Sequence, residues 1–239
     1  MKDSFNKQIM YDIEKGLDQT KEWWDEEKYI PSKKPSFAVA FRVAAGGEFF
    51  SFLLLAHNST LWKQRPLCCW HPEYHTIFRR VRNNIPICII HSSENLYLRD
   101  TSIPIIHLDC DLDFLTRLRQ IKGKAMHSKN WRMWQNKGNH KADRELAIYK
   151  EKDRKVFSNT INYFDPTKNY YDLCNTLKMT PDINFYCWAW IGYLLWQTRY
   201  IKNKEDSDRV KNTIANLKAQ LPKGYNGWTY KNDQKIYSK

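Results

Sequence analysis

The stretch FAVAFRVAAGGEFFSFLLL, from Phe37 to Leu55, contains the elements on which the expected fold is built. Its first five residues form an apolar run that suits a buried strand, and Gly46 and Gly47 allow a tight turn. A long apolar helix face follows from Phe49 to Leu55. The stretch therefore predicts a strand, a turn and a helix in direct succession.

This unit also opens the nucleotide-binding α/β folds, and its backbone suits a phosphate. Glycines let amide N–H groups approach a phosphate closely, and the helix N-terminus behind them carries partial positive charge. The predicted ligand-binding residues of the turn are Arg42, Ala45, Gly46, Gly47 and Glu48. The Walker lysine and its Ser/Thr partner are missing, so an ordinary β–α turn is the alternative. If the turn binds a nucleotide, Gly47→Val is expected to abolish that binding without unfolding the protein.

The composition describes a folded, basic protein. The chain has 239 residues, ten Trp and a net charge of +13, which supports a sizeable core and favours phosphorylated or polyanionic partners. Six Cys are scattered through apolar runs, as expected of reduced core thiols in the cytoplasm, with a virion as the other setting considered. The most hydrophobic windows, Phe49–Ala56 and Phe185–Trp196, are too short and interrupted to span a bilayer, so no membrane partner is expected.

Three parts are expected along the chain. Residues 1–36 predict an amphipathic helix that ends before Pro31 and either braces the domain or docks on a neighbouring protein. Residues 37–221 form the α/β domain, and residues 222–239 form an extended basic tail that is a second candidate contact for protein neighbours. A basic helical insertion is expected within the domain at about 117–155.

Two further strands point to an open, mostly parallel sheet with flanking helices. Ile85–His91 and Ile103–Asp109 are short, β-branched and bounded by polar loops, as buried parallel strands are. Ligands of such sheets collect beyond the carboxyl ends of the strands. His91 and Ser92 follow one strand, and Asp109 ends the other. His91, or His71 ahead of a predicted helix, is therefore a candidate general base, and Ser92 a candidate cofactor contact.

Asp109 and Asp111 also suggest a metal site. Two carboxylates at positions i and i+2 of a strand point to the same face and can share a divalent cation such as Mg²⁺. The alternative is that Asp111 or Asp113 caps the predicted helix Leu112–Ile121.

The predicted insertion holds most of the excess charge. Residues 117–155 contain thirteen basic and four acidic residues, a net charge of +9. Bases of a nucleic acid can stack on tryptophans while lysines and arginines neutralise phosphates. The residues proposed for this role are Lys129, Trp131, Arg132, Trp134 and Lys137. A solvated helical hairpin is the alternative.

The last third of the chain predicts one short strand and then helices. The strand begins at Ile161, and helices follow at Tyr170–Lys178, Phe185–Ile201 and 205–221. Apolar residues occupy nearly every side of the second helix, which predicts that it is buried.

Three segments resemble pieces of the P-loop proteins of the sulfotransferase-like kind, in the small form that bacteriophages carry. They are FRVAAGGEFFSFL (41–53), IPIIHLDCDLDFLTRL (103–118) and INYFDPTKNYYDLCNTL (161–177). The resemblance spans about 37–200 and implies a P-loop-like sheet and a phosphorylated adenosine nucleotide as cofactor. Arg42 would replace the loop lysine. Asp109 and Asp111 depart from that family, since a carboxylate repels the cofactor's 3′-phosphate. Their AspXAsp spacing is similar to the metal motif of archaeal–eukaryotic-type primases and some glycosyltransferases.

These observations support three functions. The first is a nucleotide-dependent group transferase, sulfotransferase-like or kinase-like, on a degenerate P-loop fold. The second is a non-enzymatic, nucleic-acid-binding or structural subunit of a viral or ribonucleoprotein assembly. The third is a metal-dependent nucleotidyl or glycosyl transferase that uses Asp109 and Asp111.

Overall fold

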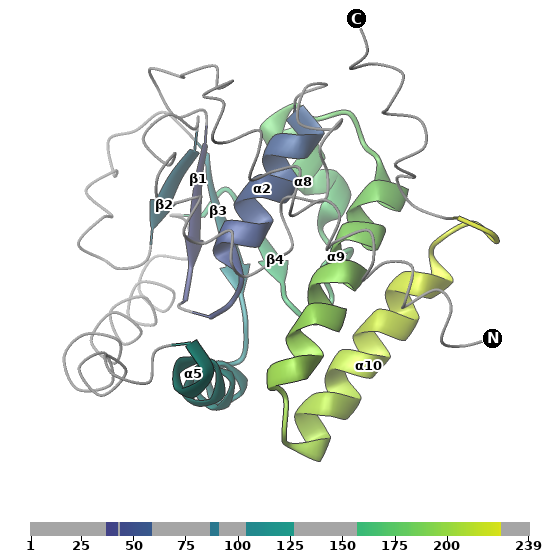
Figure 1. Ribbon diagram of the computed structural model, residues 1–239. Coiled ribbons are helices and arrows are strands. Elements are labelled where there is room, and N and C mark those ends of the chain that lie inside the picture. Colours follow the sequence, from purple (N-terminus) through teal and green to yellow (C-terminus); the bar gives the residue numbers. More distant parts are fainter. Residues whose placement is uncertain (1–36, 43, 59–86, 91–103, 127–156, 226–239) are drawn as a thin grey trace, which may run out of the picture.

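A computed structural model describes residues 37–42, 44–58, 87–90, 104–126 and 157–225. The described elements, in chain order, are β1 (Phe37–Phe41), α2 (Gly47–Asn58), β2 (Ile87–Ile90), β3 (Ile105–Asp109), α5 (Leu112–Met126), β4 (Asn159–Asn162), α8 (Tyr170–Leu177), α9 (Ile183–Gln197), the 3₁₀ turn η4 (Thr198–Tyr200) and α10 (Lys204–Ala219). Figure 1 shows the described strands side by side and the helices around them.

The four described strands form one parallel sheet in the order β2-β1-β3-β4. In the register, Val39 lies opposite Ile89 on one side and Ile106 on the other, and Leu108 lies opposite Ile161. The predicted α/β class and parallel sheet are confirmed at this level.

β1 lies between β2 and β3 and is buried on both faces. Phe37, Val39 and Phe41 belong to the main core, whereas Ala38 and Ala40 alternate with them and are also fully buried. A strand covered on both faces carries a continuous apolar run instead of alternating polar and apolar residues. This explains why the sequence FAVAF gives a central strand.

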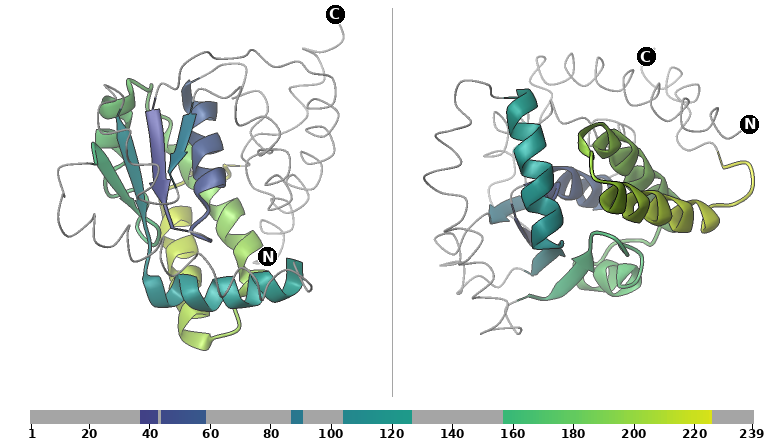
Figure 2. Two further views of the ribbon diagram at one scale, coloured as in Figure 1. Left: turned by 90° about the vertical axis from the view of Figure 1, so that its left-hand side faces the viewer. Right: turned by 90° about the horizontal axis from the view of Figure 1, so that it is seen from below.

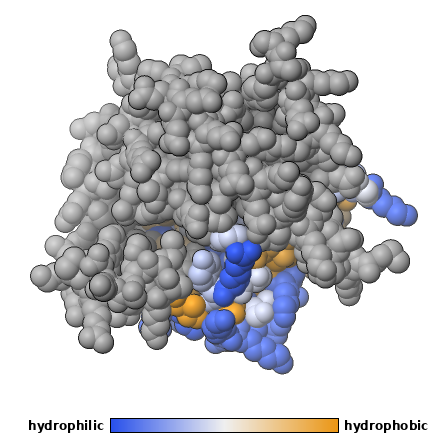
Figure 3. All heavy atoms as spheres, in the orientation of Figure 1, coloured by the Kyte–Doolittle hydropathy of each residue, from blue (hydrophilic) through white to orange (hydrophobic). Residues whose placement is uncertain are grey.

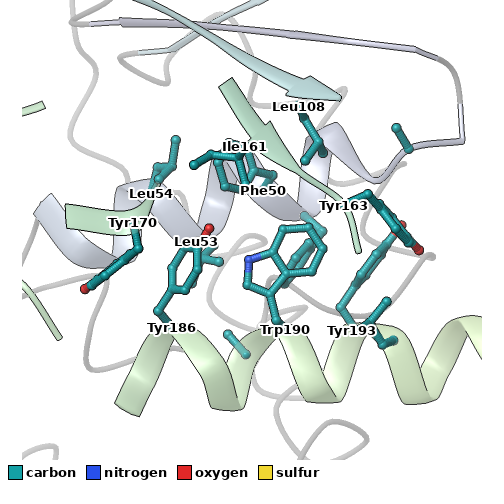
Figure 4. Close-up of a cluster of buried hydrophobic side chains, with 14 of the residues drawn as sticks. Phe50, Leu53, Leu54, Leu108, Ile161, Tyr163, Tyr170, Tyr186, Trp190 and Tyr193 are labelled. Atoms are coloured by element: carbon teal, nitrogen blue, oxygen red, sulfur yellow. The ribbon is translucent and has the colours of Figure 1, made fainter. Parts of the chain in front are cut away.

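The helix α9 has apolar residues on nearly every side and lies in the middle of the protein. Its Trp190 is fully buried, with ring centroids 5.1 Å from Phe49 of α2 and 5.7 Å from Tyr163 after β4. Figure 4 shows Trp190 pointing from α9 toward the side chains of α2 and the sheet. The helix starts where Asp182 accepts a hydrogen bond from the Phe185 amide at 3.1 Å. The predicted burial of this helix is confirmed.

The helix α10 packs along α9 and is joined to α5 by an ion pair. The Arg117 guanidinium makes two hydrogen bonds of 2.7 Å to the carboxylate of Asp206, which is buried. A bidentate pair of this kind fixes orientation as well as distance. Figure 2 shows that α5 runs crosswise beneath the sheet, whereas α9 and α10 lie alongside each other.

Most predicted elements agree with the structure to within a few residues. The helix predicted at Leu112–Ile121 continues to Met126, and the predicted helix Phe185–Ile201 starts at Ile183 and changes to the 3₁₀ turn η4 after Gln197. Cys110, Cys174 and Cys187 are buried thiols outside any disulfide. Among the described helices, none has the length and apolar character needed to cross a bilayer.

Replacing Trp190 by alanine is expected to lower the free energy of unfolding by about 3–5 kcal/mol, because the large ring has no solvent access and its removal leaves a cavity. Urea denaturation followed by circular dichroism measures the loss. Tyr171→Ala is the control, since Tyr171 is 59% exposed and its removal should cost far less. Equal losses for the two variants would contradict the central position of Trp190.

The protein is expected to lose stability in alkali. Burial raises the pKa of the Cys187 thiol to about 12, and burial first and then the neighbouring Asp111 and Asp109 raise the pKa of Cys110. The folded protein therefore keeps protons that the unfolded chain releases. The contribution of Cys187 is fully present below about pH 9 and falls between pH 9 and 12 by up to about 1.4 kcal/mol per pH unit.

Thermal melts between pH 7 and 11 test this pH dependence. The melting temperature of the wild-type protein should decline more steeply above pH 9 than that of Cys187→Ala, which lacks one of the buried thiols. Parallel declines would show that Cys187 does not contribute.

Candidate functional site

The carboxyl ends of β1 and β3 meet at the position where the order of strands reverses. The chain passes from β1 to β2 on one side, and then returns past β1 to place β3 on the other. In open parallel sheets, ligands bind outside the carboxyl ends of the strands at this switch point. The described residues that leave the two strands here are 42 and 44–46 after β1, and 110–111 after Asp109, the last residue of β3. We define these two segments, together with the N-terminus of α2, as the switch-point site.

Arg42 is the first residue after β1 and is nine-tenths buried. Its Nη1 donates a hydrogen bond to the carbonyl oxygen of Cys110 at 3.3 Å, and its Nε has no hydrogen-bond partner. Among the described residues, Arg42 forms no ion pair. A buried charge without a counter-charge is costly, so this guanidinium favours the binding of an anion.

A hydrogen bond within the turn between β1 and α2 already occupies one of the backbone amides of that turn. The Ala45 amide donates to the Arg42 carbonyl at 3.0 Å, and Ala44 and Gly46 both have positive φ. At the start of α2, the Phe50 amide donates to the Gly46 carbonyl at 2.9 Å. The Ala45 amide is therefore already occupied, which argues against its predicted role as a phosphate donor. The amides of residues 47–49 precede the first helical hydrogen bond and point along the positive end of α2.

The two glycines of the turn allow aromatic side chains to pack closely. A Cβ atom at Gly46 would lie 2.1 Å from the Tyr193 hydroxyl oxygen, and one at Gly47 would lie 2.0 Å from the Phe41 ring. Tyr193 also stacks on Phe49, with ring centroids 4.2 Å apart. The glycines are thus required by close packing of the protein itself, a reason that the sequence analysis did not foresee.

The variant Gly47→Ala is expected to destabilise the protein by about 1–3 kcal/mol, because the added methyl group overlaps the buried Phe41 ring. The larger Gly47→Val change should destabilise it at least as much, so it cannot serve as the silent probe of nucleotide binding described above. The measurement is the midpoint of urea denaturation.

Phe41→Leu supplies the matched control, since it removes the ring that the new methyl group meets. The double variant Gly47→Ala/Phe41→Leu should be more stable than the sum of the two single losses predicts. Strict additivity would contradict the close contact.

Asp109 and Asp111 occupy different kinds of structure. Asp109 ends β3, whereas Asp111 lies just before α5, where its Oδ1 accepts a hydrogen bond from the Phe114 amide at 2.8 Å. The helix begins at Leu112, and the Leu115 amide bonds to the Asp111 carbonyl. Because the strand ends between the two residues, the expectation that both carboxylates point to one face of a strand does not apply. The capping alternative is confirmed for Asp111, and Asp113 lies within the first helical turn.

Arg209 of α10 adds a second cation near this edge. Its Nη1 lies 3.8 Å from Asp111 Oδ2, and its guanidinium stacks 4.0 Å above the Phe164 ring. Both side chains of the pair remain more than a third exposed. Figure 3 shows mainly hydrophilic atoms where α5 and α10 reach the surface at this end. Sequence reasoning missed Arg209, because nothing in the polar helix distinguishes it from the other charged residues.

Cys110, between the two aspartates, is a buried and neutral thiol. Burial raises the pKa of its thiol most strongly, and the negative charges of Asp111 and Asp109 raise it further, whereas Arg209 lowers it. A thiol in this state is a poor nucleophile. Its carbonyl oxygen, which holds Arg42, is the part that matters for the site.

The described residues provide no complete metal site of their own. Nowhere in this part of the chain do three His, Cys, Asp or Glu side chains gather closely enough to hold an ion. A shallow pocket of about 150 Å³ lies between α5 and the start of α10, and its apolar lining includes Phe114, Leu118 and Ile121. None of the residues predicted for function lines this pocket.

Several predicted functional residues lie outside the described part of the chain. They are His71, His91, Ser92, Lys129, Trp131, Arg132, Trp134 and Lys137, together with segment 1–36 and most of segment 222–239. Their roles stay predictions. The structure brings Arg42 into contact with Cys110, the residue between Asp109 and Asp111, to which the sequence analysis had assigned a separate function.

Comparison with models of known protein families gives no match, and comparison with curated protein sequences gives none either. The function is therefore argued from the switch-point site alone.

Proposed function

We propose that this protein binds a nucleotide, or a closely related phosphorylated ligand, at the switch-point site and transfers a group from it. The observation that carries the proposal is the buried Arg42, whose Nε has no hydrogen-bond partner and which forms no ion pair with a described residue. A phosphate supplies the negative charge and the acceptor oxygens that this guanidinium needs.

The N-terminus of α2 supports the same ligand. Its first amides follow directly from the turn that contains Arg42, so a phosphate near Arg42 would also meet the positive end of the helix. The missing loop lysine is then replaced by an arginine that comes from the end of the strand. This arrangement is in keeping with a degenerate P-loop-like protein, and the sulfotransferase-like relationship is part of the proposal.

In the transfer step, the residues of the site would act mainly by electrostatics. Arg42 and the helix N-terminus would hold the phosphate and stabilise negative charge that develops as the transferred group leaves. A general base for the acceptor hydroxyl is expected from His91 or His71, both outside the described residues. The proposal for binding rests on Arg42 and does not depend on which histidine acts.

Arg42→Gln is expected to weaken nucleotide binding about tenfold to a hundredfold, because it removes a charged hydrogen-bond donor worth about 1.5–3 kcal/mol. The measurement is isothermal titration of the full chain with ATP, GTP and 3′-phosphoadenosine 5′-phosphate. Arg42→Lys keeps the charge but loses the planar guanidinium. Its affinity for the nucleotide should therefore lie between those of the wild-type protein and Arg42→Gln.

Lys178→Gln is the matched control, since this exposed lysine follows α8 and takes no part in the switch-point site. Thermal melts without ligand complete the test. They check that Arg42→Gln, which loses the hydrogen bond to the Cys110 carbonyl, is still folded. Unchanged affinity in Arg42→Gln would refute the proposed site.

The second candidate, a nucleic-acid-binding subunit without enzymatic activity, rests on the basic residues at 117–155. Its stacking and phosphate-binding residues lie outside the described part, so it stays a prediction. Binding of an oligonucleotide without binding of any free nucleotide would favour it over the transferase.

A further inference from the structure

Two buried tyrosines pack against the switch-point site. Tyr193 comes from the second half of α9, and Tyr163 directly follows β4. Tyr193 is only 4% exposed, and Tyr163 has no exposed surface. Their ring centroids are 6.2 Å apart with the ring planes at 76°, and Figure 4 shows both side chains at the same end of the buried cluster. We call these two residues the tyrosine pair.

Tyr193 contacts the turn between β1 and α2 at two points. Its ring stacks on Phe49, in the first turn of α2, with centroids 4.2 Å apart and the ring planes at 5°. Its hydroxyl oxygen fills the space that a Cβ atom would take at Gly46, whose φ is +81°. The hydroxyl end of Tyr193 therefore meets the backbone of the turn, and its ring meets the helix that follows.

Tyr163 connects Tyr193 to the other segment of the site. Its backbone amide donates to the carbonyl of Asp109, the last residue of β3, at 2.8 Å. Burial raises the pKa of the Tyr163 hydroxyl well above its usual value, and the neighbouring Tyr193 and Cys110 raise that pKa further. Tyr163 therefore lies between Tyr193 and the segment whose Cys110 carbonyl holds Arg42.

We propose that Tyr193, braced by Tyr163, is a positioning residue: its hydroxyl end holds the turn in the conformation that presents the first amides of α2 to a phosphate. This inference rests on the proposed function, since it concerns how the same site is kept ready for its ligand. Neither tyrosine is expected to touch the ligand. Tyr193 acts through the backbone of the turn, and Tyr163 acts through Tyr193.

The hydroxyl group is the part of Tyr193 that bears on the ligand. The ring on Phe49 contributes to the core, and a phenylalanine would keep that stacking. Gly46 adopts its left-handed conformation without strain, but glycine also leaves such a conformation more easily than other residues do. An oxygen atom packed where its Cβ would be limits that freedom. Without this oxygen, the amides that follow Gly46 lose part of their fixed direction, which weakens binding at a preorganised site.

Hydrogen exchange of the ligand-free full chain, followed by mass spectrometry, tests the contact directly. In Tyr193→Phe, the peptide that covers residues 44–50 should exchange several times faster than in the wild-type protein, because local opening of the turn becomes easier. Tyr163→Phe should speed the same peptide to a smaller extent. Tyr186→Phe is the matched control: it also removes a buried hydroxyl from α9, but that hydroxyl donates to the Pro166 carbonyl at 3.1 Å. It should leave the 44–50 peptide unchanged.

Isothermal titration with ATP, GTP and 3′-phosphoadenosine 5′-phosphate then tests the effect on the ligand. The nucleotide that the wild-type protein binds most tightly should bind Tyr193→Phe about threefold to tenfold more weakly, because a small misplacement of binding groups is enough to reduce affinity. Tyr186→Phe should bind it as the wild-type protein does, even if both variants lower the melting temperature equally. A general loss of stability would not distinguish the two variants in this way.

The outcomes separate this inference from the proposed function. Unchanged exchange of the 44–50 peptide in Tyr193→Phe, an equal increase in Tyr186→Phe, or unchanged nucleotide affinity in Tyr193→Phe overturns the positioning role and leaves the transferase proposal standing. Unchanged exchange in Tyr163→Phe overturns the bracing role of that residue. If the wild-type protein binds no nucleotide, the proposed function itself is overturned, whereas the exchange result still decides whether Tyr193 holds the turn.

Discussion

The burial of β1 on both faces is the constraint on which the described structure depends. Phe37, Val39 and Phe41 face the core that α2 and α9 complete, and Ala38 and Ala40 are buried on the opposite face. β1 also pairs with β2 and β3 and leads directly into α2, so the places of these three elements follow from its position. The chain leaves this buried strand through Arg42, which explains why a charged side chain lies almost without solvent access at the edge of the sheet.

Close aromatic packing and the candidate site share the same few residues. Phe41 packs against Gly47, Tyr193 against Gly46 and Phe49, and Trp190 against both Phe49 and Tyr163. This packing places the described residues of the turn between β1 and α2 against α9. Preorganised groups lose less freedom when a ligand binds, so a closely packed turn suits a site that acts mainly by electrostatics. Stability and ligand binding are consequently coupled at Gly46 and Gly47.

The charged residues of the switch-point site come together only in the folded protein. Arg42 and Cys110 are 68 residues apart in the chain, and Arg209 is 98 residues beyond Asp111, yet each pair is in contact. Neither the glycine turn nor the AspXAsp spacing indicates these contacts by itself, because each can be explained by local structure: packing of aromatic rings for the glycines, and helix capping for Asp111.

By itself, the sequence determined the elements whose patterns are local. The apolar run from Phe37 to Phe41, the apolar helix around Trp190 and the amphipathic helix before Leu221 were predictable, since burial imposes their periodicity directly. Only the tertiary structure decided that Asp111 caps α5, that Ala45 uses its amide within the turn, and that Arg42 lies against Cys110. These features depend on where strands end and on which distant segments meet, and such contacts leave no periodic trace in the sequence.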